Sequence, residues 1–310
     1  MPQDPHSEPV WPDPDPTELR LRSRSAELAV DLRGGGLRRL VVDDWDLLDG
    51  YPAGTVPQGR RGGVLVPWPN RLRDGRWTWE GHDEQLAVVS PESPNAMHGL
   101  VSWQPWAVLV ATETAATVGT VLEARPGYPF RLAVALDYVL AGGSLSVTLR
   151  VRNLGSAPAP FGAGMHPYLH VGAHEEGGIA GAELSVPARS VVETDGGLPT
   201  GGSHRFHGDI GRIGTRVFDD PLTDLVRDDD GWARVHLRGP LGDLVLAVDG
   251  SWPWLQIYTG DQLPEGQRRR SLAVEPMTCP PNALADGADL VVLDPGQAWS
   301  GIWTLSWTAR

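Results

Sequence analysis

Short runs of alternating apolar and polar residues, separated by glycine-rich turns, extend along the chain from Glu18 onward. Alternation with a period of two is typical of β-strands that bury one face. No segment keeps a helical period of apolar residues over a dozen positions. The pattern predicts strands at 27–32, 37–42, 64–66, 76–80, 84–89, 106–110, 117–123, 131–140, 144–152, 235–238, 243–248, 254–259, 271–275 and 299–307.

The clearest pair of strands is predicted at 131–140 and 144–152, on either side of the turn Ala141-Gly-Gly143. Side chains two positions apart point to the same face of a strand. The second strand therefore has one apolar and one polar face, as expected for a hairpin at the edge of a core. The apolar face carries Leu145, Val147, Leu149 and Val151, and the polar face carries Ser144, Ser146, Thr148, Arg150 and Arg152.

The 38 glycines and 28 prolines follow no repeat, which indicates many turns and few long helices. No linker rich in proline or serine interrupts the chain after residue 17. We therefore predict an all-β fold, a large antiparallel β-sandwich, formed by residues 18–310 as a single domain. Residues 1–17 are rich in proline and aspartate and nearly free of apolar side chains, so we expect a disordered leader there.

The net charge of −13 argues against nucleic acid or an anionic membrane surface as a partner, because both require a basic protein face. A small neutral ligand fits this charge better. All 26 basic residues are arginines. The absence of lysine excludes Schiff-base chemistry and a P-loop lysine.

Cys279 is the single cysteine, which excludes an internal disulfide and any metal site built from several cysteines. The N-terminus lacks the charged and then apolar pattern of a signal peptide. No apolar run approaches the ~18 residues that span a bilayer. We expect a cytoplasmic protein with no membrane partner.

Polar side chains in apolar surroundings occur at four places. Two prolines flank Trp68 and exclude a helix there, so Asn70 and Arg71 are predicted on an irregular loop between strands. The planar guanidinium of Arg71 can bind hydroxyls or a carboxylate, and a structural ion pair is the alternative. His98 precedes Gly99 and by itself is also compatible with a turn. The other two places are His166 in Gly164-Met-His-Pro-Tyr168 and Glu275 in Ala273-Val-Glu-Pro276.

His166 and His170 have the spacing of two metal ligands on a helix. Pro167 and the preceding glycines disfavour a helix, and residues four apart in an extended strand lie ~13 Å from each other. This distance is too large for one ion, so no metal is predicted. A hydrogen-bonded core histidine remains an alternative for His166.

Glu275 follows the apolar residues Leu272-Ala-Val274, and Pro276 is expected to end the strand at this point. The carboxylate would then leave the sheet edge into a sheltered place. Desolvation raises the proton affinity of a carboxylate, which suits a general base. A salt bridge to an arginine is the alternative.

The thirteen tryptophans can stack on sugars, but most occupy alternating strand positions and are expected in the core.

Taken together, these motifs occur in the order and approximate spacing of the aldose 1-epimerase (galactose mutarotase) family, which the chain resembles from about residue 18 to its C-terminus. The motifs are Pro67-Trp-Pro-Asn-Arg-Leu-Arg-Asp-Gly75, His98-Gly99, Gly164-Met-His-Pro-Tyr168, Phe218-Asp-Asp-Pro-Leu222, Gln256-Ile-Tyr-Thr-Gly260 and Glu275-Pro276 with Pro281-Asn-Ala283. The resemblance implies a large antiparallel β-sandwich of the mutarotase type, with the sugar in an open cleft on one sheet.

By the same resemblance, His166 would be the general acid that protonates the ring oxygen, and Glu275 the general base that deprotonates the anomeric hydroxyl. No cofactor and no metal would be needed, and the partner would be a small-molecule aldose. Further residues implied to bind the sugar or to lie beside it are Arg71, His98, Asp219, Asn70 and Gln256.

Two positions depart from the common family pattern: Leu169 stands where phenylalanine is frequent, and Asp220 where histidine is frequent. A preference for galactose or glucose therefore cannot be carried over. Whether Asp219 or Asp220 faces the sugar is left open, and the oligomeric state is expected to be a monomer or a homodimer.

Three other functions compete with a mutarotase. A catalytically silent sugar-binding module would need neither His166 nor Glu275. A hexose-6-phosphate epimerase would need arginines around the cleft, for which Arg60-Arg61 and Arg268-Arg-Arg270 are candidates. A glycoside hydrolase that uses Asp219 and Glu275 as its two carboxylates would leave His166 without a role.

Overall fold

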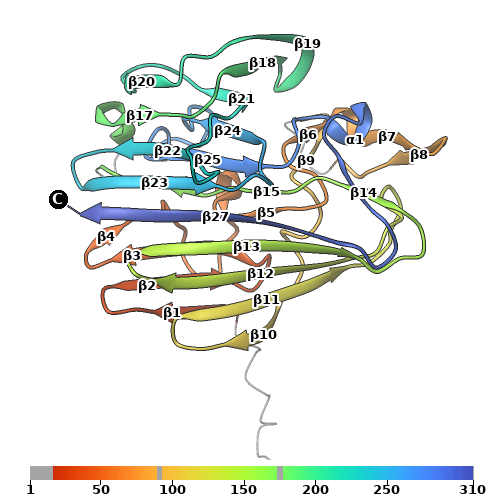
Figure 1. Cartoon of the computed structure of the whole chain (residues 1–310), viewed down its shortest axis with the longest axis horizontal. Helices are drawn as coiled ribbons and strands as arrows, with labels where there is room; N and C mark the ends of the chain where they lie inside the picture. Colours follow the sequence, from red (N-terminus) through yellow and green to blue (C-terminus); the bar gives the residue numbers. More distant parts are fainter. Residues whose placement is uncertain (1–16, 89–92, 173–176, 310) are drawn as a thin grey trace, which may run out of the picture.

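The computed structural model describes residues 17–88, 93–172 and 177–309. Apart from Thr17, the predicted leader lies outside these residues. The regular secondary structure of the described chain consists almost entirely of antiparallel strands, which confirms the predicted all-β class. Figure 1 shows the long strands of one sheet stacked above one another, with the shorter strands of a second sheet beside them.

The larger sheet has nine strands in the order β10-β11-β12-β13-β27-β23-β22-β17-β20. The predicted hairpin is confirmed, because β12 and β13 pair along their whole length from Leu132↔Asn153 to Ala141↔Ser144. The bounds are β10 Ala107–Ala111, β11 Ala115–Leu122, β12 Leu132–Ala141, β13 Ser144–Asn153, β27 Ala298–Ala309, β23 Gly242–Val248, β22 Ala233–Arg238, β17 Glu183–Ser185 and β20 Asp209–Arg212.

The second sheet has eight strands, seven of them in the order β19-β18-β21-β24-β25-β15-β5, and β16 also pairs with β25. Strand β25 is therefore central, with β24 on one side and β15 and β16 on the other. The bounds are β19 Leu198–Arg205, β18 Ser190–Asp195, β21 Asp219–Thr223, β24 Trp254–Tyr258, β25 Leu272–Met277, β15 Gly164–Met165, β5 Val64–Leu65 and β16 Tyr168–Leu169.

A four-stranded N-terminal sheet and several short elements complete the fold. The N-terminal sheet consists of β1 Glu18–Arg22, β2 Ala26–Asp31, β3 Gly36–Val42 and β4 Trp45–Asp46. Three strand pairs are β6 Arg71–Leu72 with β9 Ala96–Met97, β7 Arg76–Trp79 with β8 His82–Gln85, and β14 Ala159–Phe161 with β26 Val291–Leu293. The helical turns are η1 Gln58–Arg60, η2 Arg73–Gly75, η3 Gly178–Gly181 and α1 Ala283–Asp286.

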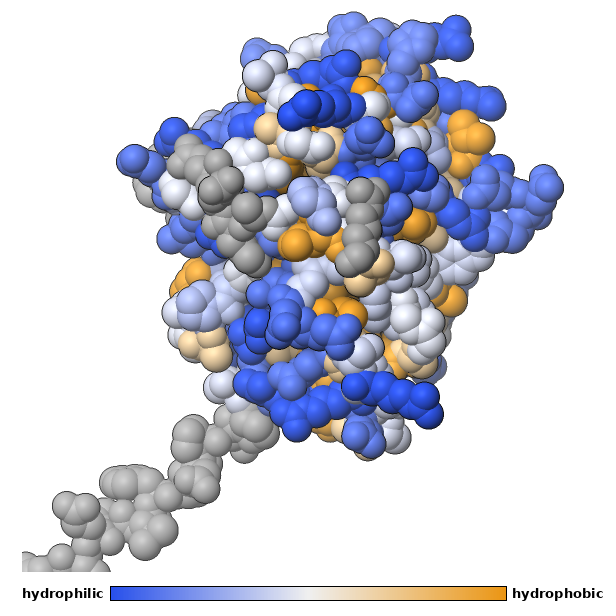
Figure 2. Space-filling view, turned by 90° about the vertical axis from the view of Figure 1, so that its left-hand side faces the viewer, coloured by the Kyte–Doolittle hydropathy of each residue, from blue (hydrophilic) through white to orange (hydrophobic). Residues whose placement is uncertain are grey.

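Apolar side chains from both large sheets form one buried cluster, with Leu136 and Leu149 from the nine-stranded sheet and Leu255 and Ile257 from the eight-stranded one. Figure 2 shows one face of the molecule, where polar residues cover most of the surface and apolar residues occur in small groups. No helix among the described residues is long and apolar enough to cross a membrane.

Two strand predictions are wrong. The strand predicted at 84–89 ends at Gln85, because the buried Leu86 turns away and its N–H donates to the carbonyl of Gly75 at 2.8 Å; Val89 lies outside the described residues. Pro276 does not end the strand at Glu275. Strand β25 continues to Met277, which pairs with both neighbouring strands, so the missing N–H of the proline is tolerated within the sheet.

The Asp49 carboxylate joins three distant parts of the chain in the interior. It accepts hydrogen bonds from Arg61 at 3.1 Å, from Arg270 at 3.1 Å and from the hydroxyl of Ser271 at 2.9 Å. The backbone N–H of Asp49 donates to the carbonyl of Tyr168 at 2.9 Å. These bonds connect the segment that follows β4 to the segment that precedes β25 and to β16.

We expect Asp49→Asn to lower the free energy of unfolding by about 3–5 kcal/mol, because it leaves the guanidinium of Arg61 buried without its counter-charge. Urea denaturation followed by tryptophan fluorescence measures the change. The matched control is Glu123→Gln, which removes an exposed pair with Arg131 and should leave the midpoint unchanged. Equal midpoints for both variants would contradict a stabilising role for Asp49.

Candidate active site

The register of the eight-stranded sheet brings a group of polar side chains to one of its faces. Glu275 on β25 pairs with Gln256 on β24, and Gln256 pairs with Pro221 on β21. Paired residues in adjacent strands point to the same face, and so do residues two apart in one strand. Asp219 therefore lies on the same face as Glu275. The prediction that the carboxylate leaves a sheet edge is wrong, because Glu275 projects from the central strand.

A chain of hydrogen bonds connects the predicted sugar-binding residues. The Asn70 amide donates to Gln256 Oε1 at 3.2 Å, and Gln256 Nε2 donates to Asp219 Oδ1 at 2.7 Å. The other Asp219 oxygen lies 3.9 Å from a guanidinium nitrogen of Arg71. Arg71 and Asp219 are the most exposed residues of this hydrogen-bonded series, with 17% and 30% of their side chains accessible. The polar network thus reaches the surface at this end.

Asp220 differs from Asp219 because it points to the other face of β21. Its strand partner is the buried Ile257, and the charge of His204 acts on it from β19. Burial and the neighbouring Asp219 raise the pKa of Asp220. Of the two aspartates, Asp219 joins the network that contains Gln256.

Asn70 and His98 are fixed to each other by two hydrogen bonds. The His98 N–H donates to the Asn70 carbonyl at 2.9 Å, and the Asn70 N–H donates to His98 Nδ1 at 3.2 Å. The pairing of β6 with β9 places them opposite each other, with Arg71 as the first residue of β6 instead of in the predicted loop. Gly99 is required here, because its φ is +72° and a Cβ atom would stand 2.2 Å from the carbonyl oxygen of Val66.

His166 lies between β15 and β16, and both its backbone N–H and its carbonyl make hydrogen bonds. Its N–H donates to the Gly63 carbonyl at 3.0 Å, and its carbonyl accepts from the Gly62 N–H at 2.9 Å. The imidazole is stacked on the Tyr168 ring at a centroid distance of 4.9 Å, with the His98 ring edge-on at 5.4 Å. Its orientation is therefore fixed by backbone bonds and by ring contacts.

The central feature of the site is the contact between His166 and Glu275. Nε2 of His166 lies 3.3 Å from Oε1 of Glu275, and the two residues are 4% and 2% exposed. His166 Nδ1 and Glu275 Oε2 are also buried, and neither has a hydrogen-bond partner in the described chain. Each residue therefore keeps one polar atom for another group.

Burial sets the protonation of these groups, because it disfavours their charged forms. It raises the pKa of Glu275 well above its ordinary value and lowers that of His166 to about 3. Burial therefore favours the uncharged forms of both groups. Burial also lowers the pKa of His98, and since Nδ1 of this ring accepts a hydrogen bond, Nε2 carries the proton and is a donor.

The arrangement can release a proton from one side chain and accept one at the other. Of the predicted site residues, the structure brings together His166, Glu275, His98, Asn70, Gln256, Asp219 and Arg71. His170 is separate from this group: its Nδ1 contacts the carbonyl of Asp46 at 2.9 Å. Among the described residues, no cluster of three or more histidine, cysteine or acidic side chains is placed to hold a metal.

Two further residues position the site and carried no role in the sequence analysis. Tyr168 stacks on His166 and donates its hydroxyl to the Gly59 carbonyl at 2.9 Å. Asn282 donates its N–H to the Arg71 carbonyl at 2.7 Å and accepts from the Arg73 N–H at 2.9 Å. Both residues lie within the motifs that resemble the family, so the sequence pointed to these positions. Their contacts could not be predicted, because they join segments far apart in sequence.

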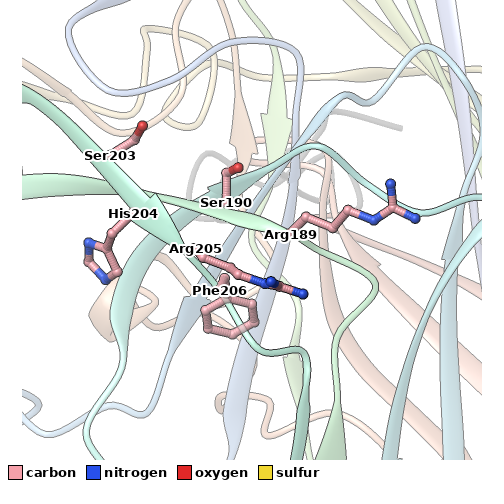
Figure 3. A pocket seen from close by; sticks show the side chains of 6 residues that line it. All are labelled: Arg189, Ser190, Ser203, His204, Arg205 and Phe206. Carbon is pink, nitrogen blue, oxygen red and sulfur yellow. The ribbon is translucent and has the colours of Figure 1, made fainter.

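The chain also has a surface hollow of about 610 Å³ on β18 and β19. Figure 3 shows its six lining side chains, with the guanidinium groups of Arg189 and Arg205 on one side and the His204 imidazole on the other. No carboxylate is among these residues, and most of them are exposed. The hollow lacks the buried acid and base that the other site contains.

Comparisons with known proteins agree with this fold. The model of a protein family described as aldose 1-epimerase matches residues 18–306. The chain is 32% identical over 271 residues to the uncharacterized protein YihR of Escherichia coli (strain K12), which covers 85% of this chain and 84% of that protein. It is 26% identical over 292 residues to the galactose mutarotase of Mus musculus, with coverages of 84% and 82%. The crystal structure of a GalM/aldose epimerase homologue from C. elegans superimposes with a TM-score of 0.81 at 16% identity, over 94% of this chain and 98% of that one.

We expect neither His98 nor His166 to titrate near pH 6.5, because burial holds their pKa values below this ordinary value. Nitrogen-15 NMR of histidine-labelled protein measures this, with His98→Gln and His166→Gln variants for assignment. The urea-unfolded chain is the control, since all its histidines should titrate near this pH. Titration of either buried ring near pH 6.5 would contradict the neutral state.

Proposed function

Since the chain belongs to the aldose 1-epimerase family, we propose that it interconverts the α and β anomers of an aldose by acid–base catalysis. The match over residues 18–306 confirms the resemblance predicted from the motifs. The observation that carries the proposal is the contact of 3.3 Å between His166 Nε2 and Glu275 Oε1, both buried. Anomer exchange needs one acid and one base close together, and it needs no nucleophile.

In the proposed reaction, the Glu275 carboxylate takes the proton of the anomeric hydroxyl, and the His166 imidazolium gives its proton to the ring oxygen. The C1–O5 bond breaks as the C1 carbonyl forms. Rotation about C1–C2 and the reverse proton transfers close the ring to the other anomer. One proton enters the pair and one leaves it, so the total charge of the pair does not change.

The buried environment favours this transfer. The reactive form, a carboxylate beside an imidazolium, has the same number of protons as the neutral pair and arises by moving one proton across 3.3 Å. After ring opening the proton is on Glu275 and His166 is neutral, which is the form that burial stabilises. The pKa shifts of both residues thus favour the opening step.

The remaining residues would bind and orient the sugar. His98 offers a neutral Nε2–H donor beside the His166 ring. Asn70 and Gln256 are hydrogen-bonded to each other. The more exposed end of the same network consists of Asp219 and Arg71. This mixture of donors and acceptors suits sugar hydroxyls.

Each competing function leaves part of this geometry without a use. A silent binding module has no need for a buried acid–base pair. A hydrolase with Asp219 as a catalytic carboxylate would have to use a group already bonded to Gln256.

The arginines proposed for a phosphate site are mostly committed to protein partners. Arg61 and Arg270 bind Asp49, Arg269 binds Asp261, and Arg268 donates to the Leu263 carbonyl. A cytoplasmic location and a monomeric or homodimeric state remain predictions from the sequence.

We expect Glu275→Gln and His166→Asn each to reduce the enzymatic rate of anomer exchange by about 10²–10⁴-fold, because each removes one of the two proton-transfer groups. NMR magnetisation exchange between the α and β anomers measures the rate over a panel of aldoses, after subtraction of the spontaneous rate. His204→Asn is the control, since this histidine is exposed and its partner is Glu193. No acceleration of any sugar by the wild type, or full rates in both variants, would refute the proposal.

The pH dependence should reflect the lowered pKa of His166. We expect no change of the catalysed rate from protonation of His166 near pH 6.5, because burial lowers the pKa of this residue to about 3. An exposed histidine acid would instead show a change near its ordinary pKa of about 6.5. Rates measured at constant ionic strength with background subtraction would show such a change directly, and it would contradict the buried pair as the catalytic unit.

A further inference from the structure

Arg60 lies beside the catalytic pair, on a loop that is bonded to His166. The next residues, Gly62 and Gly63, make the two backbone hydrogen bonds that hold His166, at 2.9 and 3.0 Å. The preceding residue, Gly59, accepts the Tyr168 hydroxyl at 2.9 Å. Arg60 itself adopts a φ of +58°, in the left-handed region that non-glycine residues occupy at a cost. The backbone thus fixes Arg60 close to the proposed general acid.

The positive charge of Arg60 reaches the site. It contributes to lowering the pKa of both His98 and His166, so it acts on both rings. Arg71, the other arginine of the site, lies near Asp219 at 3.9 Å and is thereby partly neutralised. The charge of Arg60 is therefore the main uncompensated positive charge beside the pair within the described chain.

The guanidinium of Arg60 is poorly satisfied by the protein. Its Nη1 atom is buried and has no hydrogen-bond partner in the part of the chain that the structure describes, and no ion pair joins it to a carboxylate there. Its Cζ atom lies over the Trp103 ring at 4.9 Å from the centroid, and Trp103 is 51% exposed. The adjacent Arg61, in contrast, is paired with Asp49. Stacking on the indole orients the guanidinium but supplies no acceptor for its N–H groups.

We propose that Arg60 binds a carboxylate at carbon 6 of the sugar, so that the substrate class is a hexuronate. This inference rests on the proposed function, in which His166 acts at the ring oxygen. Carbon 6 is attached to carbon 5, which is bonded to that oxygen, so a group beside His166 meets the carbon 6 substituent first. One guanidinium matches the single charge and the two oxygens of a carboxylate, whereas a phosphate dianion would keep an unpaired charge.

The test compares glucuronate with glucose in the wild type, in Arg60→Gln and in Arg60→Lys. We expect the wild type to have the higher kcat/KM for glucuronate. In Arg60→Gln, the ratio of kcat/KM for glucuronate to that for glucose should fall by about 10- to 100-fold, the effect of removing a charge-assisted hydrogen bond. Arg60→Lys should recover part of the ratio because it keeps the charge. The control Arg39→Gln removes an exposed arginine paired with Asp46 and should leave the ratio unchanged.

Three results would overturn the inference: an unchanged ratio in Arg60→Gln, a wild type that prefers glucose, or a larger dependence on Arg60 for glucose 6-phosphate than for glucuronate. Thermal melts of each variant verify that it is folded.

Calorimetric titration of glucuronate into Glu275→Gln and into Glu275→Gln/Arg60→Gln separates this inference from the proposed function. Weaker binding in the double variant supports Arg60 as the carboxylate ligand even if the wild type accelerates no anomer exchange. In that case the proposed reaction fails and the binding site stands. Equal binding by the two variants overturns the role of Arg60, whatever the wild-type rate.

Discussion

The chemistry proposed for this protein depends on the removal of His166 and Glu275 from water. In solution an imidazole and a carboxylate would exchange protons with the solvent at their ordinary pKa values. At 4% and 2% exposure, both groups have pKa values shifted by burial, and Nε2 lies 3.3 Å from Oε1. Burial then favours the uncharged forms of both groups. Anomer exchange needs two coupled proton transfers and no net change of charge, so it suits such a buried environment.

The fold supplies the two halves of the pair by different means. Glu275 is fixed by sheet register, because β25 is the central strand of the eight-stranded sheet and carries hydrogen-bonded neighbours on both sides. His166 is fixed by a loop, with Gly62 and Gly63 bonded to its backbone and Tyr168 stacked on its ring. The buried Asp49 carboxylate connects these two parts through Arg61 and Arg270. The rigidity of the site thus derives from strand pairing at Glu275 and from loop hydrogen bonds and ring stacking at His166.

Near His166 and Glu275, some charged side chains have a neighbour of opposite charge and one does not. Asp219 and Arg71 lie close enough to screen each other, and they continue the hydrogen-bond chain from Gln256. Arg60 has a buried nitrogen without an acceptor in the described chain and an aromatic ring as its neighbour. In the proposed function the first group would bind hydroxyls and Arg60 would bind an anion, so catalysis and choice of substrate would depend on different residues.

The sequence by itself determined the all-β class, the long hairpin β12–β13 and the polar residues that meet at the site. These features are local: alternation reports which face of a strand is buried, and motifs such as His98-Gly99 mark turns that only glycine can make. The strands between β14 and β21 were not predicted, because most are two to six residues long and rich in glycine, proline or polar residues. The tertiary structure decided that Glu275 lies in a central strand, that Asp219 and not Asp220 joins Gln256, and that Arg61 has a carboxylate partner while Arg60 has none in the described chain. Each of these depends on the register between strands far apart in sequence, which no local pattern encodes.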